Sequence, residues 1–138
     1  MPFLFGKQWT RRELQSYSGA PWQVGSVRPM RFVGGTEDGV EMVQFETGTG
    51  LAFQVLPSRG LDIASAKFQG ASLALEMPTG EAHPAFFDPR GIEWLRTFHV
   101  GLVTTCGLTW AGAPCQDAGQ DLGLHGRYSH LPARNLKI

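Results

Sequence analysis

The chain has 138 residues, with 12 Lys and Arg against 12 Asp and Glu, so its formal net charge is zero. The length predicts one domain with room for a hydrophobic core, and the balanced charge excludes nucleic-acid binding by phosphate neutralisation and a polybasic membrane surface. Only 17% of the residues are charged, while glycine occurs 18 times and proline nine times. This composition is typical of short strands joined by tight turns, so we expect a mainly β protein.

Two features predict a cytoplasmic location. The apolar start, residues 1–5, is short and lacks a basic lead-in, so it is not a secretory signal, and no apolar run is long enough to cross a bilayer. The two cysteines, Cys106 and Cys115, do not make a disulfide framework.

A short helix over residues 10–17 is the first predicted element, because Thr10-Arg-Arg-Glu13 has the spacing of a capping box. A meander of antiparallel strands follows, with alternating apolar side chains and glycine-rich turns. We expect strands over residues 23–33, 40–46, 51–55, 61–68 and 71–75. Since Pro29 cannot donate a ladder hydrogen bond, the first of these strands should lie at an edge.

The middle of the chain, residues 76–96, has loop composition and is followed closely by another aromatic residue. Phe86, Phe87, Trp94 and Phe98 place four aromatic rings within a short distance in the sequence. Long loops in compact domains often form a lid or a pocket wall, and aromatic rings suit the C–H faces of sugars. The alternative is that these rings close one end of a sandwich, since buried aromatic residues mostly serve packing.

The last third of the chain predicts one more strand, over residues 98–106, and then a loop over residues 107–120. The final residues, 135–138, look like the opening of another strand. We therefore expect residues 1–138 to form a single, incomplete β-sandwich domain, either a fragment or a half that is completed by another chain.

Several common sites are not supported. His99, Cys106, Cys115 and His125 lack the spacing of a zinc site, and we expect no metal. No glycine-rich nucleotide motif or serine nucleophile elbow occurs, so we expect no cofactor. A Cys106 nucleophile is formally possible, but the residue lies in an apolar alternating segment, which favours a buried, inert thiol.

The segment Asp121–Tyr128 carries an imidazole and a guanidinium two residues apart, His125 and Arg127, between glycines. In an extended segment these two side chains would point to the same face. Hydrogen-bonding groups of this kind suit an oxygen-rich ligand such as a sugar. The alternative is an ordinary loop with a surface ion pair.

A second charged turn, Pro57-Ser-Arg-Gly-Leu-Asp62, lies between two predicted strands. Arg59 and Asp62 could form a local ion pair that pins the turn. They could also lie at the rim of the concave face that carries His125. The spacing does not distinguish these two interpretations.

Several segments in order resemble a bacterial branch of the aldose 1-epimerase-like, or galactose mutarotase-like, proteins. These segments are Pro57–Ile63, Pro78–Glu81, Phe87–Gly91, Trp94–Arg96, Thr105–Leu108 and Leu124–Arg127. The resemblance implies a galactose-mutarotase-like β-sandwich, of which this chain is the N-terminal half, with a sugar pocket on a concave sheet face. It also implies that Leu124-His-Gly-Arg127 corresponds to a Leu-His-Gly-Gly segment whose histidine contacts the sugar.

The resemblance suggests roles for individual residues. His125 is the expected catalytic-site residue that hydrogen-bonds the sugar, and Trp94 or Trp110 would stack on its ring. The remaining expected substrate-binding residues are Arg59, Asp62, Thr105 and Arg127. In the family, an Asn-Arg pair contacts substrate where this chain has Thr104-Thr105, a departure that predicts a different or modified sugar.

The leading hypothesis is therefore the carbohydrate-binding part of an isomerase that interconverts sugar anomers by acid–base ring opening. In the family the catalytic histidine and glutamate follow the Leu-His-Gly-Gly segment, so we expect this part to be inactive alone. The alternatives are a non-catalytic carbohydrate-binding module, or a structural homo-oligomer that pairs exposed strand edges.

Overall fold

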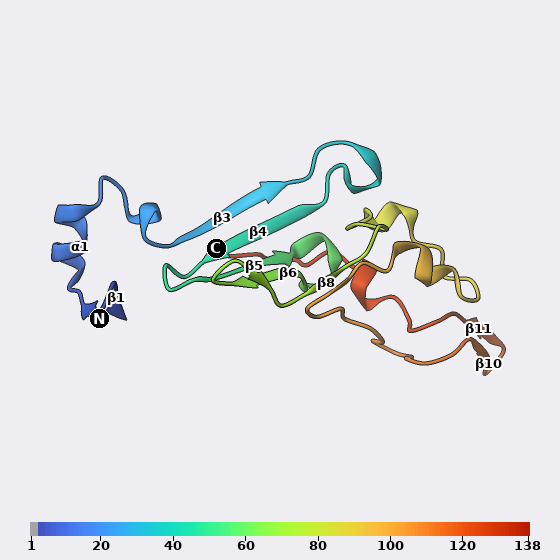
Figure 1. Ribbon diagram of the computed structural model, residues 1–138. Coiled ribbons are helices and arrows are strands. Elements are labelled where there is room, and N and C mark those ends of the chain that lie inside the picture. Colours follow the sequence, from blue (N-terminus) through green and yellow to red (C-terminus); the bar gives the residue numbers. More distant parts are fainter. Residues whose placement is uncertain (1–2) are drawn as a thin grey trace.

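The computed structural model describes residues 3–138, which form an elongated molecule (Figure 1). An N-terminal arm lies at one end, an antiparallel sheet lies in the middle, and loops with short strands make up the other end. Among residues 3–138, no helix has the length and apolar character needed to cross a membrane.

The arm contains two short paired strands and the one α-helix of residues 3–138. These are β1 (Phe3–Leu4), β2 (Lys7–Gln8) and α1 (Arg11–Tyr17). The predicted capping box is confirmed, because Thr10 accepts from the Glu13 backbone N–H while the Glu13 carboxylate accepts from the Thr10 N–H. No residue of α1 is buried, so capping and not core packing defines this helix.

The central sheet has five antiparallel strands in sequence order. They are β3 (Ser26–Arg31), β4 (Glu41–Glu46), β5 (Leu51–Leu56), β6 (Asp62–Phe68) and β7 (Ala71–Ser72). The expected meander is confirmed, and β3, which contains Pro29, lies at an edge.

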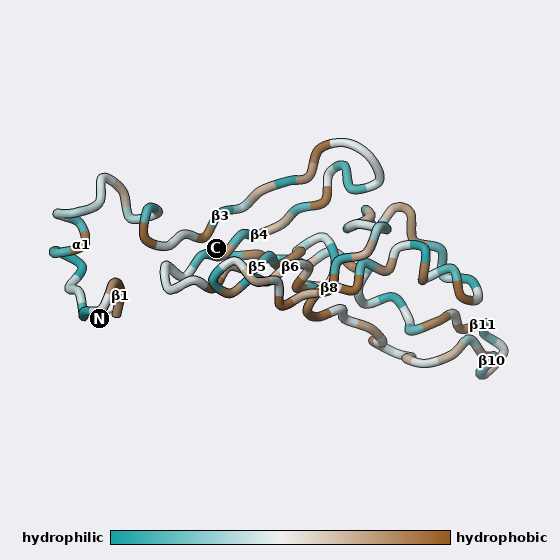
Figure 2. The backbone as a smooth tube through the Cα atoms, in the orientation of Figure 1, coloured by the Kyte–Doolittle hydropathy of each residue, from teal (hydrophilic) through white to brown (hydrophobic). Residues whose placement is uncertain are grey.

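On one face of the sheet, the register aligns apolar side chains in cross-strand rows. The two rows are Val27–Phe45–Phe53–Ala66 and Pro29–Val43–Val55–Ile63. The residues between them form a polar row, Arg28–Gln44–Gln54–Ser65, on the opposite face. On that face the next side chains along β4 and β5, Met42 and Leu56, are apolar and buried. This alternation appears as changing colours along the strands in Figure 2, as the two-residue period of a strand requires.

The buried core lies where the loop after β3 meets the ends of β4, β5 and β6. Val40, Met42, Leu56 and Ala64 are buried there, and Phe32 packs against them. A register shift between Gln54 and Val55 marks a bulge in the β5–β6 pair. Bulges increase the local twist, and beyond this one the two strands are joined by the turn Pro57–Leu61.

Outside the sheet, the described residues contain six short strands that form three two-stranded pairs, of which β1–β2 is one. The other two pairs are β8 (Leu75–Glu76) with β9 (Val100–Gly101), and β10 (Cys115–Asp117) with β11 (Gln120–Leu122). The structure contains mainly antiparallel β-structure with one short N-terminal helix, as the sequence predicted.

Four local predictions were wrong. Residues 135–138, expected to open another strand, have no regular secondary structure. The strand expected over residues 98–106 is reduced to β9, whose two residues have φ of 69°, and one bridge, Ile63–Val103. These positive φ values prevent a continuous extended backbone across the stretch. Residues 107–120 are not all loop, since Ala118 and Gly119 have positive φ and form the hairpin turn of β10–β11. Cys106 is exposed and not buried.

Candidate functional site

The turn between β5 and β6 carries two charged side chains that are completely buried, Arg59 and Asp62. Gly60 in this turn has φ of 59°, and a Cβ there would lie 2.6 Å from the Tyr128 carbonyl oxygen and 2.7 Å from Thr105 Oγ1. Two later segments of the chain therefore pack directly on the turn, which only glycine permits at this position.

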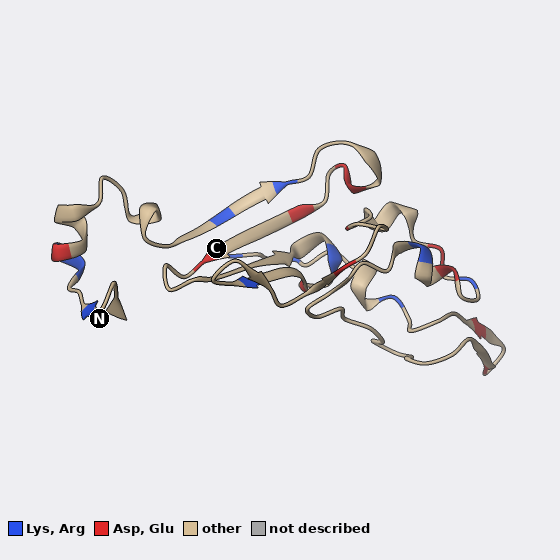
Figure 3. Cartoon of the chain, viewed as in Figure 1, with Lys and Arg blue, Asp and Glu red and all other residues tan. Residues whose placement is uncertain are grey.

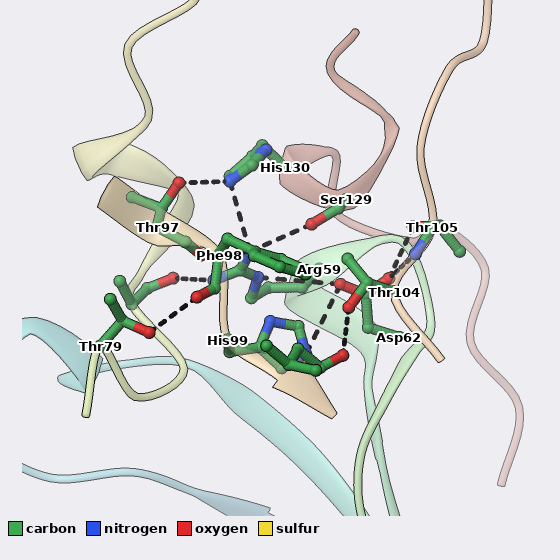
Figure 4. Close-up of polar contacts among 12 residues, drawn as sticks. Arg59, Asp62, Thr79, Thr97, Phe98, His99, Thr104, Thr105, Ser129 and His130 are labelled. Atoms are coloured by element: carbon green, nitrogen blue, oxygen red, sulfur yellow. Dashed lines mark hydrogen bonds and ion pairs between the residues drawn. The ribbon is translucent and has the colours of Figure 1, made fainter. Parts of the chain in front are cut away.

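Arg59 connects three separate loops through its guanidinium (Figure 4). Nη1 donates to the Ala82 carbonyl at 2.9 Å, and Nη2 donates to the Thr97 carbonyl at 2.9 Å and to Ser129 Oγ at 3.0 Å. Nη2 also lies 3.3 Å from Nε2 of His130. The planar fork of arginine suits a node of this kind, in which several acceptors surround one buried cation.

Asp62 holds a fourth segment. Its Oδ1 accepts hydrogen bonds from the Thr105 backbone N–H at 2.7 Å and from Thr105 Oγ1 at 2.6 Å. The other oxygen, Oδ2, lies 4.0 Å from Arg59 Nε and 3.8 Å from His99 Nε2. These two separations are too long for hydrogen bonds. The opposite charges of Arg59 and Asp62 therefore compensate each other through proximity and not through a direct hydrogen bond.

We define the buried polar cluster as Arg59, Asp62, Thr97, His99, Ser129 and His130, all of which are buried. Burial raises the pKa of Asp62 and lowers the pKa of Arg59. Burial and the nearby Arg59 charge lower the pKa of His99 to about 4 and the pKa of His130 to about 3. Both imidazoles are therefore neutral at pH 7.

Neutral histidines fit the interior because the guanidinium is already present as a cation. Since arginine can only donate, His130 Nε2 accepts from Arg59, and the proton of the neutral ring lies on Nδ1. Within residues 3–138, His130 Nδ1, Asp62 Oδ2 and both His99 ring nitrogens have no hydrogen-bond partner.

A cavity of about 380 Å³ lies beside this cluster, at the loop end of the molecule. Phe87 and Trp110 supply aromatic surface to it, and Gln120, Asp121 and Arg127 supply polar groups. No carboxylate of the described chain lies within ion-pair distance of Arg127. The cavity thus combines flat apolar surface with hydrogen-bond donors and acceptors.

Glycines allow the cavity segments to approach each other closely. A Cβ at Gly123 would lie 1.9 Å from the Pro89 carbonyl oxygen, and one at Gly126 would lie 2.4 Å from the Trp110 carbonyl oxygen. The Trp110 indole N–H donates to the Gly123 carbonyl at 2.9 Å. These contacts fix the Trp110 ring against the segment that carries Arg127.

The structure separates the two residues of the Leu124–Arg127 motif. His125 lies in a turn with φ of 56°, not in an extended strand, so the expectation of a shared face was wrong. Its half-buried ring lies edge-on to Trp94 with 5.1 Å between centroids, whereas Arg127 is exposed and lines the cavity.

The other predicted site residues also divide into two groups. Trp110 lines the cavity with Arg127. Arg59, Asp62 and Trp94 are buried, and half-buried Thr105 binds Asp62. Their contact with a sugar remains a prediction that these positions do not test.

Sequence reasoning missed His130, Thr97 and Ser129 as members of the cluster and Asp121 as a cavity residue. Nothing in the sequence around Tyr128-Ser-His130 distinguishes it from a surface loop. Asp121 did carry a signal, since it opens the segment that contains His125 and Arg127. In residues 3–138, no group of three or more His, Cys, Asp and Glu side chains is arranged to hold a metal ion.

Comparison with solved structures agrees with the sequence resemblance. The chain matches the crystal structure of a "putative aldose 1-epimerase" from Klebsiella pneumoniae subsp. pneumoniae MGH 78578 with a TM-score of 0.71 and 26% sequence identity. The match covers 78% of this chain and 29% of that one, so this chain spans under a third of the length of its structural relative. A comparison with curated proteins gives no match.

The resemblance to aldose 1-epimerase-like proteins and their fold is therefore confirmed. The family described as "Domain of unknown function (DUF4432)" matches residues 37–138, which include the sheet from β4 onward, the buried polar cluster and the cavity. On this match over most of its length, the chain belongs to the DUF4432 family.

Proposed function

We propose that this chain is the carbohydrate-binding part of an aldose 1-epimerase-like isomerase, and that the sugar binds in the 380 Å³ cavity. The observation that carries the proposal is the lining of this cavity, in which Phe87 and Trp110 lie together with Asp121 and Arg127. Sugars present C–H faces to aromatic rings and hydroxyl groups to charged and polar side chains. Ligand sites commonly combine apolar walls with a few polar groups in this way.

The polar groups have separate roles in this proposal. Arg127 donates to sugar hydroxyl or anionic groups, because a guanidinium has only donors. Asp121 accepts from hydroxyl groups with the carboxylate oxygen that Gln116 does not use, since Gln116 Nε2 donates to Asp121 Oδ1 at 2.7 Å. His125 does not line this cavity and lies edge-on to Trp94, so its hydrogen bond to the sugar stays a prediction that the cavity lining does not use.

We expect binding without anomer exchange. Ring opening needs an acid and a base that act on the same sugar. Among the described residues that line the cavity, Asp121 is a candidate for one of these roles, and no imidazole accompanies it. The same observation favours the second candidate function, a carbohydrate-binding module without catalysis.

The test is an NMR titration of the ¹⁵N-labelled chain with a panel of neutral aldoses, uronic acids and sugar phosphates. We expect saturable shifts at the Trp110 indole N–H and the backbone amides of residues 120–127. Trp110→Ala and Arg127→Ala should each weaken binding at least tenfold. Arg28→Ala, an exposed arginine on the sheet, is the matched control and should leave the affinity unchanged.

Anomer exchange is followed on the same samples by NMR or polarimetry. A rate equal to that of buffer supports the binding role. An accelerated rate that His125→Ala abolishes would instead show that the chain is active alone. No saturable shift with any sugar of the panel would reject the proposed function.

We also propose that the chain self-associates through an apolar patch on the central sheet. Phe45 and Phe53 stack at 4.7 Å with an interplanar angle of 3°, and both are only half-buried. Val27 and Phe68, at opposite sides of the sheet, are 49% and 46% exposed. An apolar patch of this kind favours association, so light scattering should show a species larger than the monomer, and a monodisperse monomer would argue against it.

A further inference from the structure

We propose that the turn Pro57–Asp62 positions both walls of the cavity, one formed by Phe87 and the other by the segments of Trp110 and Arg127. Arg59, Asp62 and His130 are positioning residues that do not touch the sugar. The inference rests on the proposed function, because the cavity is its sugar site. It assigns a role to His130 and changes the expected role of Arg59 and Asp62 from contact to support.

The first wall is held through Arg59 and His130. Nη2 of Arg59 reaches Nε2 of the His130 ring at 3.3 Å, and Thr97 Oγ1 reaches the same nitrogen at 2.7 Å. The His130 ring stacks on Phe87 with 4.0 Å between centroids and an interplanar angle of 11°. Phe87 lines the cavity, so the contacts to Nε2 anchor a ring whose face supports an aromatic wall.

The second wall is held through Asp62 and Thr105. Asp62 Oδ1 binds both the backbone N–H and the hydroxyl of Thr105. Two residues later, Gly107 pairs with Gly126, and its N–H donates to the His125 carbonyl at 2.7 Å. Gly126 and its neighbour Arg127 line the cavity.

The turn itself is tightly held between these segments. The Gly60 N–H donates to the Leu131 carbonyl at 2.8 Å, next to the His130 side of the cluster. On its other side, Gly60 approaches Thr105 and Tyr128 so closely that a Cβ would clash with both. A shift of the turn would therefore move both walls together.

Arg59, Asp62 and His130 are buried too deeply to touch the sugar. Arg59 and Asp62 have no exposed surface, and His130 is 6% exposed. None of the three is among the residues that line the cavity. Their influence on the ligand must pass through Phe87, Trp110 and Arg127.

The first test uses Arg59→Lys and His130→Gln in the full chain. Arg59→Lys keeps the charge and loses the fork, whereas His130→Gln keeps an acceptor for Arg59 and loses the ring that stacks on Phe87. We expect each to raise the sugar Kd at least tenfold and to shift the Phe87 ring resonances. His130→Gln remains informative if Arg59→Lys fails to fold.

A matched control separates positioning from general destabilisation. Val40→Ala removes two methyl groups from the core cluster, which does not include any cavity residue. It should lower the unfolding midpoint while leaving the sugar Kd within twofold of the original chain. An equal loss of affinity in Val40→Ala and His130→Gln would overturn the proposal, as would unchanged affinity in both Arg59→Lys and His130→Gln.

The second wall has its own readout. Thr105→Val removes the hydroxyl that binds Asp62 and keeps the backbone N–H, so the Trp110 indole N–H resonance should move while the Phe87 ring resonances stay. If the original chain binds no sugar, the proposed function fails, but these two spectroscopic signatures still decide the positioning role. Unchanged Phe87 resonances in Arg59→Lys, which keeps the stacked His130 ring, and an unchanged Trp110 resonance in Thr105→Val would overturn it.

Discussion

The sheet of β3–β7 and the loop region of residues 75–131 are ordered by different forces. In the sheet, each strand pairs with the next strand in sequence, and alternating side chains form cross-strand rows. In the loop region, the strands are only two or three residues long. There the order comes from the guanidinium and the carboxylate of one turn, which bind four distant segments.

The comparison shows where each region can tolerate change. A ladder distributes its stability over many similar hydrogen bonds and cross-strand pairs, each of modest energy. A buried polar cluster concentrates its contacts in a few atoms, and removing one partner leaves buried groups unsatisfied. Charged residues of both signs are distributed along the whole molecule (Figure 3), so burial and not a regional net charge distinguishes the two regions.

The largest expected effect is that of Arg59→Met. It removes the buried cation and leaves the Thr97 and Ala82 carbonyls and Asp62 without their partner, at a cost of about 3–5 kcal/mol in the free energy of unfolding. Hydrogen exchange should show lost protection in the loop region and retained protection in β4 and β5. Equal loss in both regions would show that the two are not ordered independently.

The second-largest expected effect is that acid lowers the stability of the loop region. The pKa values of His99 and His130 in the folded chain, about 4 and about 3, lie below the unfolded value of about 6.5. At each of these two histidines the unfolded chain therefore binds more protons than the folded chain below about pH 6.5, and their contribution to stability is constant above that pH. It should fall by about 1.4 kcal/mol per pH unit for each histidine as the pH drops toward 4.

Asp62 and Glu81 act in the opposite direction, because burial raises the pKa of both carboxyls and so disfavours folding at neutral pH. Urea denaturation between pH 7.5 and pH 4.5 measures the slope. His99→Asn should reduce the slope by the contribution of about one proton, which is about 1.4 kcal/mol per pH unit. An unchanged slope would show that His99 does not contribute to the acid sensitivity.

Phe53→Ala tests the sheet alone. Phe53 stacks on Phe45 but is half-buried, so we expect a loss of about 1–2 kcal/mol, less than for a fully buried phenylalanine. The Trp110 and Phe87 resonances at the cavity should not move. If they do, the sheet face and the cavity are coupled, and the two regions cannot be treated separately.

Thr10→Ala should have the smallest effect. It removes the capping hydroxyl of α1 and should cost about 1 kcal/mol within the helix. Because no residue of α1 is buried, the global unfolding midpoint should stay the same while amides of residues 11–17 exchange faster. Thr10→Ser keeps the hydroxyl and is the control, and a lowered global midpoint in Thr10→Ala alone would show that the arm is part of the cooperative unit.

The sequence by itself determined the capping box at Thr10, the order of the sheet strands and the edge position of Pro29. Each of these depends on residues that are close in the chain, through the period of a strand, the reach of a side chain or the missing N–H of proline. The family resemblance could also be recognised from the sequence, because short motifs such as Leu124–Arg127 are identified by their residues and order alone, without their contacts.

Only the tertiary structure decided what those motifs do. It buried Arg59 and Asp62, joined them to Thr97, Thr105, Ser129 and His130, and placed Arg127 on the cavity while turning His125 toward Trp94. These contacts link residues up to 71 positions apart. The fate of a charged side chain depends on how many such partners the fold brings within hydrogen-bonding distance, which local spacing does not encode.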